Sequence, residues 1–298
     1  MISLVIPVHN EEGNIEPLYQ EIKGVMDSLG EEYEIIYVND GSTDGSGEIL
    51  RRIKAQDPRV RVLEMDRNRG EAAALTAGFH HARGDIVVSM DGDGQNDPAY
   101  IPRLLEKLRE GYKAVSGWRE KRKEPFLTRV LPSRMANWII GMVTGVRVHD
   151  NGCSLKAYRG EAVKSVHIPH GFHRFIPAIF GVKNNEVAEV KIKDRPRRWG
   201  SSHYGLSRTL EVLRELVTIP FILRGSPGSR YCLKVCSNVG LALLLLYLLF
   251  CLWVPRGFYF FPFPLAVVVA SRVAYKNLER FLQAQKEGAF SVSEPEQQ

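Results

Sequence analysis

The first hundred residues alternate between short apolar runs and longer segments with helical spacing. The strand-like runs are Ile2–Val8, Tyr33–Asp40, Val60–Met65 and Asp85–Asp91. The segments typical of helices are Glu12–Leu29, Ser46–Ala55, Gly70–Ala82 and Pro98–Arg109. In Glu12–Leu29 the apolar residues recur every three or four positions, which predicts a helix with one buried face. Strands that alternate with helices predict a parallel, doubly wound α/β sheet.

The middle of the chain has a less regular pattern. Thr128–Thr144 and Ser207–Leu223 have the spacing of amphipathic helices. Gly152–Tyr158 and Glu186–Asp194 are rich enough in alternating apolar residues to predict two further strands.

A long apolar segment follows, at Val235–Val254, and it contains no charged residue. Twenty helical residues span about 30 Å, which is the hydrocarbon thickness of a bilayer. A buried core helix is the alternative, but such helices seldom run so long without a charge. The next apolar segment, Phe258–Ser271, contains Pro262 and Pro264. It is short for a span, and we expect it to be the return arm of a helical hairpin.

Basic residues flank this predicted hairpin on both sides, whereas only Arg256 lies between its two arms. The positive-inside rule then places both ends in the cytoplasm. We therefore expect a catalytic domain at residues 1–223, a transmembrane hairpin at 231–275 and a cytoplasmic tail at 276–298. The expected location is the cytoplasmic (inner) membrane, with a multi-pass anchor and the catalytic domain in the cytoplasm.

The charge of the chain adds information about partners. The formal net charge is +6, and basic residues are concentrated in Arg119–Arg134 and Lys191–Arg208. A basic chain attracts nucleic acid, anionic membrane lipids or phosphorylated small molecules. Because these basic stretches lie beside predicted membrane-facing elements, we favour membrane lipids and phosphates and expect no nucleic acid. The four scattered cysteines exclude a disulfide scaffold.

Polar loops follow three of the predicted strands, where ligands of parallel sheets bind. The most informative is Asp91–Gln95, in which Asp91 and Asp93 can face one cavity. Paired carboxylates repel each other unless a cation lies between them, and hard Mg²⁺ or Mn²⁺ ions suit oxygen ligands. Such an ion can bridge the oxygens of a diphosphate. The alternative is a solvated Asp-Gly turn.

The other two loops are less specific. Asn39–Gly45 can be a turn with a helix N-cap, or Asp40 can bind a base or ribose. Pro7–Glu11 can simply end a strand, or the His9 ring can stack on a base.

Taken together and in this order, the three loops resemble those of the family 2 glycosyltransferases. The motifs of that family are Pro-x-Tyr-Asn-Glu, Asp-Asp-x-Ser-x-Asp and Asp-x-Asp. This sequence departs from them at His9, where a Tyr is usual, and at Asn39, where the first Asp is usual. The resemblance implies a GT-A fold, which is Rossmann-like with a mostly parallel sheet. It also implies that the nucleotide sugar contacts Pro7, His9, Asn10, Glu11, Asn39, Asp40 and Asp91.

Further motifs resemble those of polyprenyl-phosphate hexosyltransferases, namely the dolichyl-phosphate mannose synthases and their bacterial undecaprenyl-phosphate relatives. These motifs are Ser116–Arg119, Arg129-x-x-x-Ser133, Asp150–Arg159, His173–Ala178 and Arg195–Gly205. The resemblance implies that the lipid phosphate is received by Arg119, Arg129 and Ser133. It implies that the metal and the phosphates are organised by the catalytic residues Asp91, Asp93 and Gln95. It also implies that a basic residue of the Arg195–Arg198 run closes over the nucleotide diphosphate, with Arg195 and Arg198 as the candidates.

Acceptor chemistry agrees with this resemblance. A lipid monophosphate is already anionic at pH 7, because its second ionisation lies at about pH 6. It therefore needs no general base. It needs cations that hold it, and arginine forks suit that task. The Cys153–Tyr158 region, where relatives that glycosylate hydroxyls carry an acid, has no carboxylate.

The resulting hypothesis is a metal-dependent inverting glycosyltransferase that moves a hexose from a nucleoside diphosphate sugar to a polyprenyl phosphate. UDP-glucose is the favoured donor and GDP-mannose the alternative. Transfer to a polysaccharide or another hydroxyl acceptor is a second hypothesis, and a non-catalytic nucleotide-sugar-binding membrane partner is a third. The resemblance also allows a homo-oligomer.

Overall fold

The computed structural model divides the chain into two compact units. It describes residues 1–119, 137–138, 140–142, 144–164, 167–169, 171–196, 199, 218, 233–235, 238–239, 241–246, 262–287 and 292–293. One unit comprises residues 1–203 and 288–298, and the other comprises residues 204–287. The predicted amphipathic helix at Ser207–Leu223 and most of the one at Thr128–Thr144 lie outside the described residues.

The first unit is built on an eight-stranded sheet with the order β7-β5-β6-β4-β1-β2-β3-β8. The strands are β1 (Ile2–Val8), β2 (Tyr33–Asn39), β3 (Val60–Met65), β4 (Ile86–Ser89), β5 (Ala114–Arg119), β6 (Lys156–Arg159), β7 (Val187–Ile192) and β8 (Val292–Ser293). Strands β3, β2, β1 and β4 are parallel neighbours, as the alternating pattern predicts. The carboxyl ends of these four strands therefore meet at one edge.

One strand reverses the expected direction. β6 pairs antiparallel with both β4 and β5, so that Tyr158 lies opposite Val87 and Ala114. The sequence predicts a strand here but not its direction, and it does not predict β5. Because β6 is antiparallel, its first residue, Lys156, lies opposite Ser89 at the end of β4. The start of β6 therefore reaches the edge where the predicted site residues lie.

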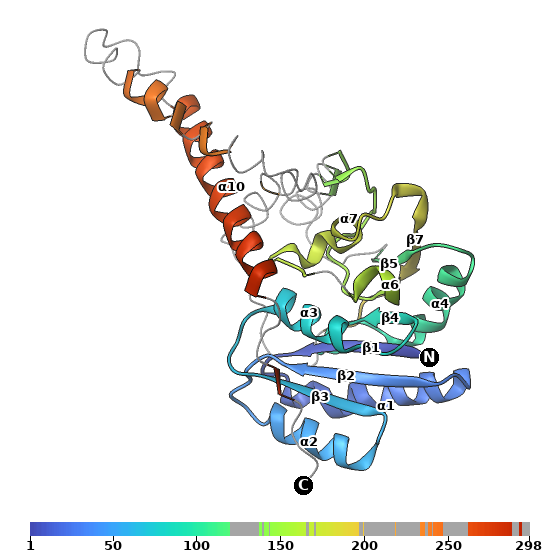
Figure 1. Cartoon of the computed structure of the whole chain (residues 1–298). Coiled ribbons are helices and arrows are strands. Elements are labelled where there is room, and N and C mark those ends of the chain that lie inside the picture. Colours follow the sequence, from blue (N-terminus) through green and yellow to red (C-terminus); the bar gives the residue numbers. More distant parts are fainter. Residues whose placement is uncertain are drawn as a thin grey trace. The chain divides into compact units, whose positions relative to one another are not determined.

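Helices cover both faces of the sheet (Figure 1). The helices α1 (Glu12–Leu29), α2 (Ser46–Gln56) and α4 (Ile101–Arg109) share a hydrophobic core with one face. That core includes Ile15 and Ile22 of α1 packed with the sheet residues Leu4 and Ile6. Burial of such side chains contributes about 1.5–3 kcal/mol each.

The helix α3 (Glu71–His81) packs on the opposite face, against β1 and β2. Small residues bring it close to the sheet. A Cβ atom at Gly78 would lie 2.2 Å from Cγ1 of Val5, so only glycine fits there. The alanine-rich composition of α3 is thus explained by close packing on the sheet.

Short elements complete this unit. They are η1 (Pro98–Tyr100), α6 (Gly160–Val163), η3 (Phe172–Phe175), α7 (Ile176–Ile179) and η4 (Asn184–Glu186). η3 packs on α3, and two of its aromatic side chains, Phe172 and Phe175, are buried. This contact places the residues between them over the first half of α3.

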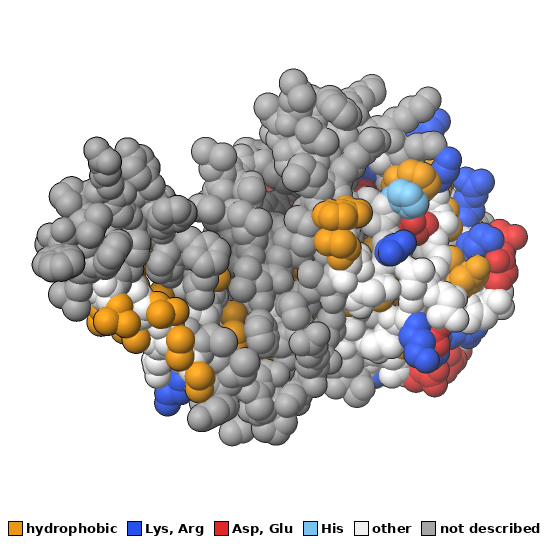
Figure 2. Space-filling model, turned by 90° about the horizontal axis from the view of Figure 1, so that it is seen from above, with side chains coloured by type: hydrophobic (Ala, Val, Ile, Leu, Met, Phe, Trp, Pro, Cys, Tyr) orange, Lys and Arg blue, Asp and Glu red, His pale blue; other side chains and the backbone are white. Residues whose placement is uncertain are grey.

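The second unit contains α10 (Pro262–Glu287), which begins within the predicted return arm Phe258–Ser271 and continues beyond it. None of the helices in the described ranges is both long and apolar enough to cross a membrane. Most of the predicted span Val235–Val254 lies outside those ranges. Large apolar side chains are nevertheless exposed on this unit, and the left part of Figure 2 shows such side chains. These residues are Val235, Val239, Leu243, Leu245, Leu246, Leu265 and Val269.

Candidate active site

The loops after β1 and β2 are joined by hydrogen bonds. Asn10 has a positive φ of 56°, a backbone conformation that Asn tolerates better than most residues. Its side-chain oxygen accepts a hydrogen bond from the Thr43 N–H at 2.8 Å, and its own N–H donates to the Ser42 hydroxyl at 3.0 Å. The Glu11 N–H donates to the Ser46 hydroxyl at 2.9 Å. The structure therefore brings the first two predicted loops together.

Asp40 fixes a third loop, the one after β3. Its carboxylate accepts hydrogen bonds from the N–H groups of Arg69 at 2.7 Å and Gly70 at 2.8 Å. The His9 ring nitrogen Nδ1 lies 2.8 Å from the Asp40 carbonyl oxygen, which can only accept, so the ring donates. Gly41 has a φ of 61°, and a Cβ there would lie 2.4 Å from the Asn68 nitrogen. His9 and Asp40 thus lie together, and Asp40 holds the start of α3 beside them.

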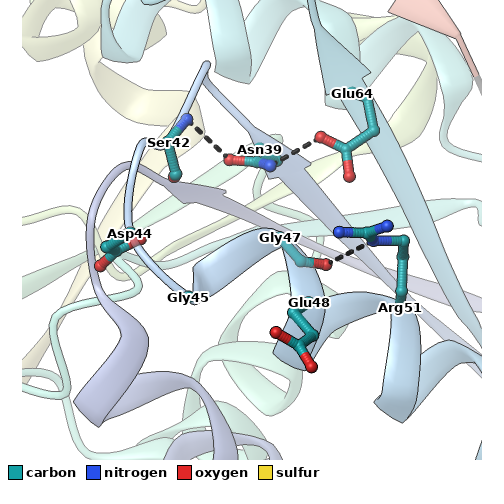
Figure 3. A pocket seen from close by; sticks show the side chains of 8 residues that line it. All are labelled: Asn39, Ser42, Asp44, Gly45, Gly47, Glu48, Arg51 and Glu64. Carbon is teal, nitrogen blue, oxygen red and sulfur yellow. Dashed lines mark hydrogen bonds between the residues drawn. The ribbon is translucent and has the colours of Figure 1, made fainter.

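Asn39 faces a different direction from Asp40. Its Nδ2 donates to Glu64 Oε2 at 2.6 Å, and its Oδ1 accepts from the Ser42 N–H at 3.1 Å. Figure 3 shows Asn39 between these two partners, at the wall of a cavity of about 490 Å³. Asp91 and Asp93 do not line this cavity. Asn39 therefore joins the end of β2 to β3, and its predicted contact with a nucleotide sugar stays a prediction.

The carboxylates predicted to bind metal follow β4, as the sequence indicates. Asp93 is buried, and its Oδ1 accepts a hydrogen bond from the Gln95 N–H at 3.0 Å. Burial raises the pKa of Asp91 well above its ordinary range, and the charges of Glu71 and Asp93 raise it further. Negative charge is thus concentrated at this point of the sheet edge.

This donor set fits a hard divalent ion. Among the described residues there is no group of three or more His, Cys, Asp or Glu side chains arranged to hold a metal. Mg²⁺ is commonly held by one or two carboxylates together with substrate phosphates, so Asp91 and Asp93 suffice in the presence of a diphosphate. When bound there, Mg²⁺ or Mn²⁺ would neutralise the charge that develops on the departing diphosphate.

Arg119, the last residue of β5, is held by two carboxylates. Its Nε and Nη2 donate to Oδ2 and Oδ1 of Asp150 at 2.6 and 3.0 Å. Its Nη1 donates to Asp194 Oδ2 at 3.1 Å. A guanidinium bound in this way has a fixed plane and a fixed charge position.

Asp194 also connects Arg119 to the predicted metal loop. Its Oδ1 accepts a hydrogen bond from Asn96 Nδ2 at 3.3 Å, and the Arg195 N–H donates to the carbonyl of Gln95 at 2.8 Å. The charge of Arg119 in turn lowers the pKa of Asp91, against the effects of burial and nearby carboxylates. Arg119 and the predicted metal loop therefore belong to one connected network.

Arg195 itself is engaged within the protein. Its guanidinium forms ion pairs with Glu21 and with Asp97, the latter at 2.8 Å. The predicted contact of Arg195 with a nucleotide diphosphate remains a prediction. The other members of the predicted phosphate sites, Arg129, Ser133 and Arg198, lie outside the described residues.

Lys156 belongs to this site and is not predicted by the sequence analysis. It is buried, and its Nζ donates to the Asn151 carbonyl at 3.0 Å. Burial lowers its pKa, while the charges of Asp150 and Asp91 among others act in the opposite direction. The Asp150–Arg159 motif was the available signal, because it places a lysine where an apolar strand residue is expected.

An α/β sheet with paired carboxylates after its middle strand and a fixed arginine in the same network defines a GT-A type of glycosyltransferase. Residues 3–170 match the family model described as "Glycosyl transferase family 2". The chain belongs to this family, and the predicted enzyme class is confirmed.

The chain is similar to two curated relatives, and each match covers about two thirds of the relative's length. Dodecaprenyl-phosphate galacturonate synthase of Rhizobium johnstonii is 40% identical over 227 residues, which are 75% of this chain and 67% of that protein. Undecaprenyl-phosphate 4-deoxy-4-formamido-L-arabinose transferase of Edwardsiella ictaluri is 39% identical over 219 residues, or 73% of this chain and 67% of that protein.

A solved structure shares the fold. Glucosyl-3-phosphoglycerate synthase of Mycobacterium tuberculosis, in complex with Mn²⁺ and UDP-glucose, matches with a TM-score of 0.57 and 22% identity. The match covers 76% of this chain and 80% of the other. It supports the GT-A assignment made from the sequence.

Proposed function

We propose that this enzyme transfers a sugar from a nucleoside diphosphate sugar to a polyprenyl phosphate, with inversion at the anomeric carbon. An oxygen of the lipid phosphate attacks that carbon in line, the new carbon–oxygen bond forms, and the bond to the nucleoside diphosphate breaks. Asp91 and Asp93 would hold the divalent ion and with it the diphosphate. Arg119 would orient the acceptor phosphate on the other side of the sugar.

One observation carries this proposal. Asp91 shares a hydrogen bond with Ser154, whose hydroxyl donates to Asn96 Oδ1 at 2.6 Å. Asn96 is in turn connected to Arg119 at the end of β5 through Asp194. A sugar ring has to lie between its leaving group and its nucleophile, so the two charged groups must face one site. Two separate cavities would be incompatible with the reaction.

The acceptor assignment rests on charge rather than on a base. The described residues around Asp91 include Lys156 and Arg119 as cations. A phosphate monoester is anionic at neutral pH and needs orientation but no deprotonation. The two curated relatives bear names of dodecaprenyl-phosphate and undecaprenyl-phosphate enzymes, in agreement with this acceptor class.

Membrane attachment follows from the acceptor and from the second unit. We propose that Val235–Val254 spans the bilayer and that the active site lies at the cytoplasmic face. The exposed leucine and valine side chains of residues 204–287 support contact with lipid, because soluble surfaces rarely expose many large apolar groups together.

We propose a UDP-hexose as the donor, with GDP-mannose as the alternative, and Mg²⁺ or Mn²⁺ as the ion. The names of the two relatives include galacturonate and formamido-arabinose, so the transferred sugar differs among similar enzymes. Donor choice therefore has to be measured on this enzyme.

The test uses the full chain in detergent with undecaprenyl phosphate, MnCl₂ and a set of radiolabelled nucleotide sugars. We expect label from one donor to enter the organic phase only when the lipid phosphate is present. Label that enters a polysaccharide or another hydroxyl acceptor instead would contradict the proposal, as would the absence of any product with every donor.

A further inference from the structure

Glu71 and His173 form a pair at the edge of the site that the mechanism above does not use. Glu71 is the first residue of α3, and His173 belongs to η3. His173 Nε2 lies 3.5 Å from Glu71 Oε2. The two residues are 102 positions apart along the chain, so only the fold brings them together.

Both residues are held in place by their own elements. The Gly70 N–H, just before Glu71, donates to the Asp40 carboxylate at 2.8 Å, which fixes the start of α3 beside the loop after β2. On the other side, the buried Phe172 and Phe175 anchor η3 on α3. The side chain of His173, between them, is only 17% exposed. The pair is therefore a built feature of the fold.

The first residues of α3 lie at the same edge of the sheet as the predicted metal loop. Asp40, which binds the Gly70 N–H, also donates its own N–H to the Val8 carbonyl at 2.8 Å, and a Cβ atom at Gly92 would lie 3.2 Å from Cγ2 of Val8. In agreement with this placement, the charge of Glu71 is, after burial, the largest cause that raises the pKa of Asp91. The charges of Glu71 and Asp91 also act to raise the pKa of the buried Lys156, against the effect of burial. These three charged groups come from the start of α3, the start of β6 and the loop after β4, all at the same edge of the sheet.

We propose that Glu71 and His173 form the wall against which the donor sugar binds. Glu71 accepts hydrogen bonds from sugar hydroxyls, and His173 acts as a positioning residue that orients the Glu71 carboxylate. The wall selects a neutral sugar over a uronate. This inference rests on the proposed function, because it takes the donor to be a nucleotide sugar whose diphosphate lies at Asp91 and Asp93.

Charge provides the physical reason for this selection. The divalent ion compensates for the negative charge of the diphosphate, but no such ion would lie beside the sugar. A carboxylate on the sugar would meet Glu71 in addition to Asp91, and like charges in a partly buried site repel strongly. A hydroxyl in the same place donates to Glu71 and makes a charge-assisted hydrogen bond.

The experiment measures the binding of UDP, UDP-glucose and UDP-glucuronate to the full chain by calorimetry in the presence of MnCl₂. The sugars of UDP-glucose and UDP-glucuronate differ only at carbon 6, which belongs to a hydroxymethyl group in the first and to a carboxylate in the second. The variants are Glu71→Gln and His173→Gln. Glu161→Gln is the matched control, since Glu161 is in the first turn of α6, whose Gly160 N–H binds the Asp85 carbonyl at the far end of β4.

We expect the wild type to bind UDP-glucose more tightly than UDP-glucuronate. In Glu71→Gln, UDP-glucose should bind about tenfold more weakly, which corresponds to about 1.4 kcal/mol, and the preference over UDP-glucuronate should shrink. His173→Gln should weaken UDP-glucose binding about threefold, a change of about 0.65 kcal/mol. UDP binding should stay the same in all variants, as should all constants in Glu161→Gln.

Three results would overturn this inference. They are an equal loss of UDP affinity in Glu71→Gln, no change for any ligand, and a wild-type preference for UDP-glucuronate. Circular dichroism of each variant excludes misfolding as the cause of a change. Because binding needs no acceptor, a failure of lipid transfer would defeat the proposed function while these constants still test the sugar wall.

Discussion

Arg119 and Asp150 form a bidentate ion pair, with Nε 2.6 Å from Oδ2 and Nη2 3.0 Å from Oδ1. The Asp150 side chain is only 2% exposed, so it depends on this partner. Replacing Arg119 by Met removes both guanidinium donors from a buried carboxylate, and we expect the free energy of unfolding to fall by about 3 kcal/mol. Urea denaturation measures this change.

The same variant separates structure from substrate binding. Arg119→Met combined with Asp150→Leu should recover most of the stability, because the buried carboxylate that Arg119 compensates is then removed as well. It should not recover transfer to the lipid phosphate. Arg109→Met, at a surface ion pair with Glu31, is the control and should change stability by less than about 1 kcal/mol. Full activity of the double variant would argue against a role of Arg119 with the acceptor.

A second prediction concerns Asn39. Its Nδ2 donates to Glu64 Oε2 at 2.6 Å. Asn39→Asp restores the residue that is usual in the family motif but places two carboxylates against each other. We therefore expect a loss of about 2 kcal/mol in the free energy of unfolding.

Glu64→Gln provides the check on this explanation. In the double variant Asn39→Asp with Glu64→Gln, an amide can again donate to a carboxylate, and stability should return to within about 0.5 kcal/mol of the wild type. Thermal and urea unfolding of the four proteins give the coupling energy. Additive effects of the two substitutions would show that the pair does not explain Asn39.

A third prediction concerns stability in acid. Hydrogen bonds from Arg59 are the main cause that lowers the pKa of Asp57 from 3.8 to about 2, and the Tyr19 hydroxyl also donates to it at 2.9 Å. A lowered carboxyl pKa stabilises the folded state above the unfolded pKa, and this contribution disappears as the pH falls through the folded pKa. This lowering of the Asp57 pKa by nearly two pH units corresponds to about 2.5 kcal/mol.

We therefore expect wild-type stability to fall between about pH 4 and pH 2 more steeply than that of Asp57→Asn, which has no such carboxylate. The measurement is urea unfolding across this pH range. A constant difference between the two proteins at every pH would contradict the assignment of the low pKa to Asp57.

A fourth prediction tests the metal loop. Asp93→Asn removes one carboxylate from the proposed ion site, and we expect transfer to fall at least about 100-fold. Addition of EDTA to the wild type should have the same effect. Asp85→Asn is the matched control, since Asp85 precedes the same strand β4 at its other end and is exposed. Normal turnover by Asp93→Asn would exclude the proposed role.

Local patterns were enough to predict the four parallel strands β1 to β4 and the helices that follow them. Each of those strands is a short apolar run, and β1, β2 and β3 are neighbours in the sheet as they are along the chain. β4 instead lies on the other side of β1. β6 could not be oriented in the same way. It lies between β4 and β5 by pairings such as Val87 with Tyr158, which join residues far apart in the sequence.

Site residues follow the same rule. Asp91 and Asp93 were found because they lie one residue apart after a strand. The partners of Arg119 were not found, because Asp150 and Asp194 come from distant loops. Glu71 gave no distinct signal either, since an acidic residue in the first turn of a helix is common in any protein.

The hydrogen bond from Arg195 to the Gln95 carbonyl has a wider consequence. This bond and the ion pairs of Arg195 with Glu21 and Asp97 connect the backbone after β7 to the loop after β4. Any ligand that shifts the chain at Arg195 also shifts the neighbours of Asp93. Substitutions at Glu21, which is on α1 and distant from Asp93 in the sequence, can therefore alter the affinity of the enzyme for its proposed donor.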